Sequence, residues 1–189
     1  MKITTQLLKQ CSENDRRAQI TLYKICFPSL MNVAMRYMVN KDDAAVMVNE
    51  GFLKIVQNLD KYSSKVPFKA WVSRVLINTI IDEFRKNKKY KELHDQKGST
   101  IQLEHSIKQE IEIKDEHKEF TADEIITLIA NLPTSSRKIF NLFAIDGYSH
   151  KEISDMFDIK EGTSKWHVSS ARQELKKLML EFKENGKRK

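Results

Sequence analysis

Residues 149–182 read SHKEISDMFDIKEGTSKWHVSSARQELKKLMLEF, and this segment determines the expected fold of the C-terminal part of the chain. Ser149 and Glu152 have the spacing of a capping box, which predicts that a short helix begins here. A turn over 158–162 and a longer helix from Thr163 to Phe182 are expected to follow. A short helix, a tight turn and a longer helix together predict a helix-turn-helix.

The longer helix has an apolar face and a polar face. Its expected buried positions recur at steps of three and four residues, and they are Ser164, Val168, Ala171, Leu175 and Leu178. The side chains that point away from this face or flank it are Lys165, Trp166, Ser169, Ser170 and Arg172. In a helix-turn-helix the second helix enters the major groove, where Lys, Arg and Ser bond bases and phosphates. His150 and His167 are expected on the polar surface, and not as ligands.

Two further helices are predicted before this segment. Thr121 and Glu124 form a second capping box, and the helix that they open is expected to stop at Leu132. Pro133 suits the start of the next helix, and Gly147 suits its end. We therefore expect a C-terminal domain of four helices.

The N-terminal part of the chain holds three segments with the period of amphipathic helices. The first, 16–39, contains Pro28, which is expected to kink or restart the helix. The second opens at Asp42 and Asp43, whose carboxylates suit a helix N-terminus. The third has Pro67 at its expected first helical position and ends in a basic run. These segments predict an N-terminal bundle of three or four helices.

The net charge of +7 is distributed unevenly, with +8 over 1–90, −3 over 91–120 and +2 over 121–189. A basic excess indicates a polyanionic partner. The middle segment is poor in large apolar residues, so we interpret it as a flexible linker. For 101–116 the alternative is a short helix packed on one domain. The predicted fold is therefore all-α, with two small helical domains over 1–90 and 121–189 joined by this linker.

The predicted third helix carries amide and basic side chains away from its apolar stripe, beside the aromatic residues near its start. Phe68 and Trp71 lie near its start, and Asn78, Arg85 and Lys86 follow. Rings stack on unpaired bases and basic groups bind phosphates, which suits a single-stranded nucleic acid. The alternative, which spacing alone favours, is that both aromatic residues belong to the core and the charges are solvated.

Several classes of protein find no support in the sequence. It has no apolar run of membrane-spanning length and no apolar signal-peptide core at its N-terminus, so direct membrane insertion is not expected. Cys11 and Cys26 have no metal-ligand spacing and are expected to be free thiols in a reducing cytoplasm. The sequence contains no phosphate loop, zinc motif or nucleophile motif, so we expect no enzyme activity, no metal and no cofactor.

Two blocks of sequence carry a resemblance to a known family. The first is WVSRVLIN at 71–78, with Asp82 and Arg85 after it. The second extends over 132–172 and includes GTSK at 162–165. In this order and spacing the two blocks resemble the promoter-melting segment and the C-terminal DNA-binding domain of bacterial RNA polymerase sigma factors. The group concerned is the small, two-domain extracytoplasmic-function (ECF) group.

The resemblance implies a promoter-specificity subunit that directs the start of transcription and has no chemistry of its own. The residues that it implies at the minus-ten element are Phe68, Trp71, Arg74, Asn78, Arg85 and Lys86. Those that it implies at the minus-thirty-five element are Thr163, Lys165, Trp166, Ser169, Ser170 and Arg172. Those that it implies at the polymerase are Asp43, Val46, Asn49, Glu50 and Phe52.

The implied partners are core RNA polymerase, promoter DNA and an anti-sigma factor that could hold the cytoplasmic chain at a membrane. The sequence departs from the family at Ala45-Val46, where an acidic pair is usual, at Asn49, where Gln is usual, and at Ser170, where Arg is common. The alternative function is a conventional helix-turn-helix regulator that binds a duplex operator. A conventional regulator has no need of aromatic residues beside the basic stripe of the third helix, so this feature distinguishes the two functions.

Overall fold

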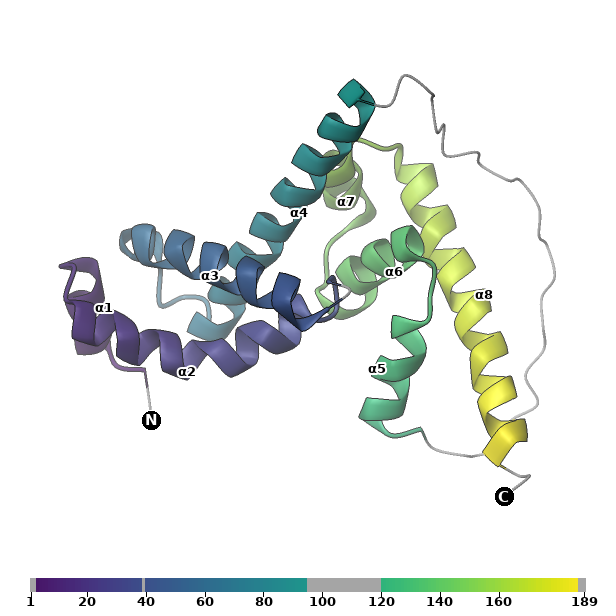
Figure 1. Cartoon of the computed structure of the whole chain (residues 1–189), viewed down its shortest axis with the longest axis horizontal. Coiled ribbons are helices and arrows are strands. Elements are labelled where there is room, and N and C mark those ends of the chain that lie inside the picture. The colour runs from purple at the N-terminus through teal and green to yellow at the C-terminus, as the bar shows by residue number, and fades with distance from the viewer. Residues whose placement is uncertain (1–2, 39, 95–119, 187–189) are drawn as a thin grey trace. The chain divides into compact units, whose positions relative to one another are not determined.

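The structure is a computed structural model that describes residues 3–38, 40–94 and 120–186. In these ranges the regular elements are all helices, as predicted (Figure 1). None of these helices combines the length and the apolar character that crossing a membrane requires. The chain divides into two compact units, Met1–Leu93 and His94–Lys189. The predicted linker and its alternative helix lie outside the described residues, except at the linker's two ends.

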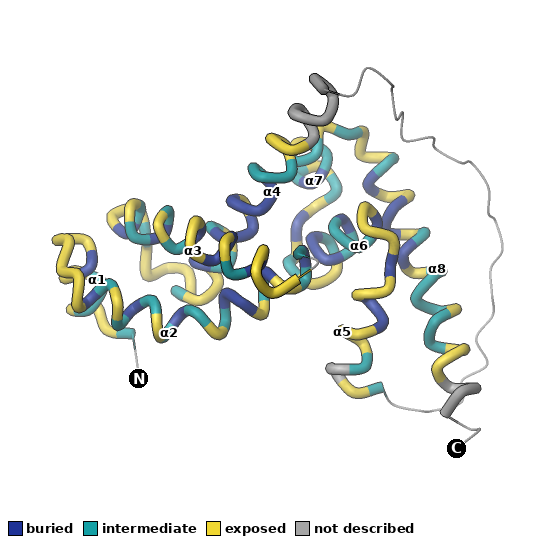
Figure 2. The backbone as a smooth tube through the Cα atoms, in the orientation of Figure 1, coloured by how far each residue is buried: buried dark blue, intermediate teal, exposed yellow. Residues whose placement is uncertain are grey.

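The first unit contains four α-helices and one turn of 3-10 helix. They are α1 (Thr5–Ser12), α2 (Arg16–Ala34), α3 (Lys41–Gln57), η1 (Leu59–Lys61) and α4 (Phe68–His94). Helices α2 and α3 lie side by side, and α1 packs against α2 and contacts η1 (Figure 1). Buried residues recur along α2 and α3 at helical spacing (Figure 2), which is the amphipathic pattern that the sequence predicted.

Local capping explains where the helices of this unit begin. Asn40 caps α3 through a bond from the Asp43 amide to Asn40 Oδ1 at 2.8 Å, and Asp42 and Asp43 occupy the first turn as predicted. Thr4 caps α1 in the same way, with the Leu7 amide as donor at 3.2 Å. Helix α1 was not among the three predicted helices. Its signals in the sequence were this cap and the helical spacing of Leu7, Leu8 and Cys11.

Helix α2 passes through Pro28, so the restart expected as one alternative is wrong, while the kink stays a prediction. Pro28 has no N–H and leaves the carbonyl of Lys24 without its helical donor. Both residues are exposed, so water can bond that carbonyl. Cys26 and Leu30 are buried on either side of the proline, and their packing holds the helix together.

Helices α3 and α4 approach each other closely at Gly51. A methyl group at this position would lie 2.7 Å from Leu76 Cδ1 and 3.4 Å from Leu76 Cα, so an alanine here would force the Leu76 side chain to move. Lys54 and Asp82 join the same two helices by an ion pair of 3.2 Å. These contacts fix the orientation of α4 about its own axis.

The second unit contains four α-helices and one turn of π-helix. They are α5 (Ala122–Ala130), α6 (Thr134–Phe140), η2 (Asn141–Ile145), α7 (His150–Phe157) and α8 (Glu161–Gly186). Helices α5, α6 and α7 each pack against α8 (Figure 1). Both predicted capping boxes are present, at the N-termini of α5 and α7. The π-helical turn was not predicted.

The predicted apolar face of α8 forms part of the core of this unit. Ser164, Val168 and Ala171 are buried, while Leu175 and Leu178 are half-buried. The turn before α8 is shorter than predicted, because α8 already begins at Glu161. The chain reverses at Asp158, whose φ of 51° is left-handed. Together α7, this turn and α8 form the predicted helix-turn-helix.

Candidate nucleic-acid and protein interfaces

One face of α4 carries all six residues predicted at the minus-ten element. At 100° per residue these positions fall within an arc of about 120°. Phe68 and Trp71 are half-buried, and the four polar members, Arg74, Asn78, Arg85 and Lys86, are exposed. The opposite face buries Val72, Leu76 and Ile80. The structure therefore brings the six residues together on a single outward face.

An aromatic cluster lies at the start of this face. The Phe68 ring centroid lies 5.1 Å from that of Tyr62 and 5.8 Å from that of Trp71, and the Tyr62 and Trp71 centroids are 5.4 Å apart. The Tyr62 hydroxyl donates to the carbonyl of Val66 at 3.0 Å, which closes the turn before α4. Neither Phe68 nor Trp71 is fully buried, so a pure core role is wrong for both.

The sequence analysis did not single out Tyr62 as a site residue, although it lies in the aromatic cluster. An aromatic residue in an otherwise polar turn was the available signal.

Two acidic side chains on α4 are engaged by neighbouring lysines. Asp82 pairs with Lys54 of α3 at 3.2 Å. Glu83 lies 3.8 Å from the ammonium of Lys86. Each pair is solvent-exposed in part, so its contribution to stability is small. The two lysines offset the negative charge of these carboxylates beside the face that carries Arg74 and Arg85.

The outward face of α3 carries the residues predicted to bind the polymerase. Asp43, Val46, Asn49 and Glu50 are exposed, and Phe52 is half-buried at the edge of this face. Leu53 is also exposed, at 58%, beside Val46 at 52%. Leu53 was not predicted, although its spacing of seven residues from Val46 was visible in the sequence.

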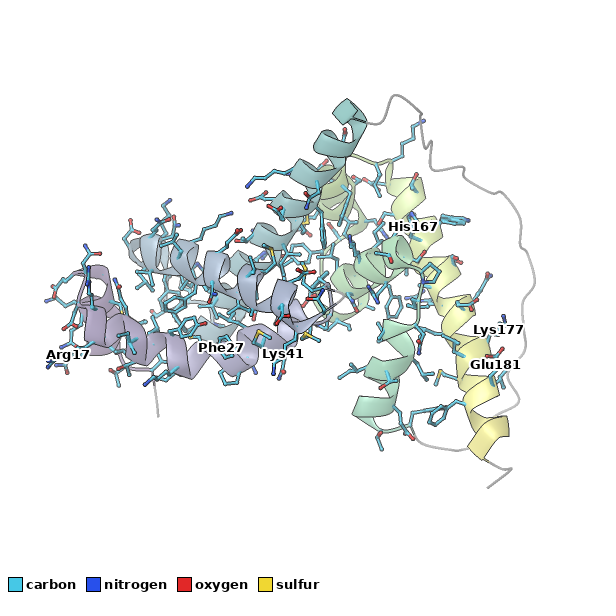
Figure 3. The ribbon with its side chains drawn as sticks, viewed as in Figure 1. Arg17, Phe27, Lys41, His167, Lys177 and Glu181 are labelled. Atoms are coloured by element: carbon cyan, nitrogen blue, oxygen red, sulfur yellow. The ribbon has the colours of Figure 1, made fainter. Side chains whose placement is uncertain are left out.

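Tyr23 of α2 reaches the same surface. Its hydroxyl donates to Asn49 Oδ1 at 2.7 Å. Its ring centroid lies 5.0 Å from that of Phe52 in an edge-on contact and 5.3 Å from that of Phe27. Figure 3 labels Phe27 on α2. Asn49 is thus held by a residue 26 positions earlier in the chain.

The outward face of α8 gathers four of the six residues predicted at the minus-thirty-five element. Lys165, Trp166, Ser169 and Arg172 are exposed and fall within an arc of about 120°. The Arg172 guanidinium carbon lies 5.9 Å from the centre of the Phe143 ring. The other two, Thr163 and Ser170, are half-buried at the edge of this face.

Two histidines join α8 to its neighbours, and the predicted surface placement is wrong for His167, which is buried. His167 is only 7% exposed, and its Nδ1 lies 3.0 Å from Ser136 Oγ of α6. Figure 3 shows His167 on α8 beside α6. His150 is half-buried, and its Nδ1 lies 3.0 Å from the Oγ of Ser164, with its ring stacked 4.3 Å from that of Phe143.

The physical reason for these pairs is the burial of two hydroxyl groups. Ser136 and Ser164 are 5% and 0% exposed, and a buried hydroxyl needs a hydrogen-bond partner. Burial also lowers the pKa of His167, because the charged imidazolium loses its hydration. Both contacts tie α8 to the elements that precede it.

Within the described residues, no group of three or more His, Cys, Asp or Glu side chains is placed to hold a metal ion. Cys11 and Cys26 are buried free thiols, and burial raises the pKa of Cys26 to about 11. A thiol with such a pKa is a poor nucleophile and a poor metal ligand at neutral pH. The predicted site residues lie on three outward helix faces, those of α3, α4 and α8.

Comparisons with known proteins match both units. Residues 22–90 match the family described as Sigma-70 region 2, and residues 122–175 match Sigma-70, region 4. The ECF RNA polymerase sigma factor SigM of Bacillus subtilis (strain 168) is 30% identical over 156 residues, which cover 78% of this chain and 89% of that protein. SigW of the same strain, also an ECF sigma factor, is 24% identical over 184 residues, which cover 93% and 96%.

Among solved structures, a similar chain is the sigma factor RpoE of Bartonella quintana in a co-crystal with the anti-sigma factor NepR. It is 21% identical, the match covers 84% of this chain and 94% of that chain, and the TM-score is 0.48.

Proposed function

The chain belongs to the ECF sigma factors of bacterial RNA polymerase, and we propose from this starting point which of its surfaces bind the promoter and which bind the polymerase. A sigma factor is the promoter-recognition subunit of that enzyme and is not itself catalytic. We propose that this chain supplies recognition and strand opening without any bond chemistry of its own. In this proposal the first unit binds the minus-ten element and the polymerase, and the second unit binds the minus-thirty-five element.

The outward face of α4 is proposed to capture the opened minus-ten strand. The observation that carries this proposal is the aromatic cluster of Tyr62, Phe68 and Trp71 beside exposed Arg74 and Asn78. Flipping a base out of a duplex costs a few kcal/mol of lost stacking and pairing. A ring that stacks on the unpaired base returns about 1–3 kcal/mol, so such a cluster favours the opened state.

The basic side chains further along α4 are proposed to bind the phosphates of the same strand. Phe68 and Lys86 lie roughly 27 Å apart along the helix axis, at 1.5 Å per residue. Arg74, Arg85 and Lys86 are exposed over this length. Their charge binds the backbone whatever its base sequence, which leaves the selection of bases to the aromatic and amide side chains.

The outward face of α8 is proposed to enter the major groove at the minus-thirty-five element. Lys165, Trp166, Ser169 and Arg172 share this face, at the N-terminal part of the second helix of the helix-turn-helix. Lys and Arg bond guanine edges or phosphates there, and Ser bonds either. Thr163 and Ser170 are proposed as contacts at the rim of the same surface.

The outward face of α3 is proposed to bind core polymerase. Val46 and Leu53 expose apolar surface there, and Asp43, Asn49 and Glu50 lie around it. An apolar centre with a polar rim is typical of a protein-binding surface. An anti-sigma factor is proposed as a further partner on these surfaces, and the cytoplasm as the compartment in which the chain meets the polymerase.

Reconstitution with core polymerase tests this function. The chain is added to core enzyme and genomic DNA, and the 5′ ends of the transcripts are sequenced. We expect a limited set of starts, each preceded by two shared sequence elements at the minus-ten and minus-thirty-five positions. If the chain neither binds core enzyme nor makes it start selectively, the proposal is wrong. The conventional regulator then becomes the better explanation.

A further inference from the structure

The side chain of Asn49 is held in one orientation by a residue of another helix. Asn49 is exposed on α3, and its Oδ1 accepts the Tyr23 hydroxyl hydrogen at 2.7 Å. Among the described residues, Tyr23 is the one hydrogen-bond partner of this side chain. An exposed amide without such a contact would rotate freely and present either its oxygen or its nitrogen outward.

The ring of Tyr23 is itself held in place. It makes an edge-on contact with Phe52 at 5.0 Å and a tilted contact with Phe27 at 5.3 Å between ring centroids. Tyr23 is half-buried, and its ring therefore has packing on two sides before any partner binds. The fixed ring therefore fixes the position of the hydroxyl oxygen, and the 2.7 Å distance to Asn49 Oδ1 is the usual length of an O–H···O bond, in which the tyrosine donates.

We propose that Tyr23 is a positioning residue for polymerase binding, and that it orients Asn49 so that the amide N–H groups face the partner. This inference rests on the proposed role of the α3 face. Because the oxygen of Asn49 is turned toward Tyr23, the amide N–H groups are left to face the partner, so the group on the polymerase that meets this position is a hydrogen-bond acceptor, a carboxylate or a carbonyl. A side chain that is oriented before binding loses less freedom on association.

The test measures the affinity of the full chain for core polymerase, without DNA, by titration of a fluorescently labelled chain. The variants are Tyr23→Phe, Asn49→Ala, Asn49→Asp and the double variant Tyr23→Phe/Asn49→Ala. Tyr23→Phe keeps the ring and its aromatic contacts and removes only the hydroxyl. Thr21→Val is the matched control, because it also removes one hydroxyl from α2, one that donates within the helix to the carbonyl of Arg17.

We expect Asn49→Ala to weaken binding about tenfold and Tyr23→Phe about threefold, the range of one lost neutral hydrogen bond. In the double variant, Tyr23→Phe should add nothing to Asn49→Ala, since there is no amide left to orient. Asn49→Asp still accepts the Tyr23 hydrogen but places a negative charge opposite the proposed acceptor on the polymerase, so it should bind more weakly than Asn49→Ala. Thr21→Val should bind like the unaltered chain.

Three results would overturn the inference. One is that Tyr23→Phe binds as tightly as the unaltered chain although Asn49→Ala does not. Another is that the two effects multiply in the double variant, and the third is that Asn49→Asp binds as well as Asn.

The variant Glu50→Ala distinguishes failure of the inference from failure of the proposed function. If Glu50→Ala weakens binding and Asn49→Ala does not, the polymerase surface stands and only the inference fails. If neither changes the affinity, the proposed polymerase surface on α3 is itself wrong.

Discussion

Replacing Trp71 with Ala removes one ring of the aromatic cluster at the start of α4. A ring that stacks on an unpaired base contributes about 1–3 kcal/mol. Trp71 is half-buried against Tyr62 and Phe68, so only part of its ring surface is available to a base. We therefore expect a loss of about 1–2 kcal/mol in the equilibrium of strand opening, which is roughly a 5- to 30-fold smaller opened fraction.

The same change also removes two aromatic contacts inside the protein. Each contributes about 0.5–1.5 kcal/mol beyond its buried area, so the N-terminal unit should lose about 1–3 kcal/mol of stability. Ile80→Val provides a matched control, because Ile80 is fully buried on the opposite side of the same helix. It should cost about 1 kcal/mol of stability without touching the outward face.

Strand opening is measured by the permanganate reactivity of thymines around the minus-ten element, with chain and core polymerase at saturating concentration. We expect Trp71→Ala to lower the reactivity, Trp71→Phe to retain most of it, and Ile80→Val to leave it unchanged. Protection of the minus-thirty-five duplex should stay the same in all three variants. Normal opening with Trp71→Ala would refute the role of the ring, and equal loss of opening and of duplex protection would refute the division between the units.

Three further predictions concern both units. Lys165→Ala should cost about 1–3 kcal/mol of affinity at one position of the minus-thirty-five element if Lys165 contacts a base, and an unchanged footprint would exclude that contact. Gly51→Ala should lower the free energy of unfolding in urea by about 1 kcal/mol, because a clash with Leu76 (about 1–3 kcal/mol) outweighs a gain in helix propensity of about 1 kcal/mol. Burial lowers the pKa of His167, so as the pH falls this imidazole is protonated in the unfolded chain before it is protonated in the folded one. The free energy of unfolding should therefore be unaffected by His167 above a pH of about 6.5 and should decrease below it. His167→Asn should flatten this dependence, and an unchanged pH profile would show that another group is responsible.

The parts of the fold that depend on neighbouring residues were predictable from the sequence. The capping boxes at Thr121 and Ser149 join residues three positions apart, and both are present. The outward face of α8 was predicted from the spacing of its apolar residues, which is visible in the sequence. Local spacing also placed Asn78, Arg85 and Lys86 away from the apolar stripe of the third helix.

Features that depend on distant residues were not predictable. The continuation of α2 through Pro28 is decided by packing on both sides of the proline, which overrides the local preference. The bonds of Ser136 to His167 and of Tyr23 to Asn49 join positions 31 and 26 residues apart. Such pairs become visible only when the helices are packed.

Promoter binding by the free chain, compared with binding by the chain on core polymerase, tests most directly whether this protein works as a sigma factor. The DNA is a duplex that carries both elements found by sequencing transcript starts, with a scrambled duplex as control. We expect weak, nearly nonspecific binding by the free chain, and tight, specific binding once core polymerase is added. Tight and specific binding by the free chain, unchanged by polymerase, would contradict the proposed function and identify a conventional operator-binding regulator.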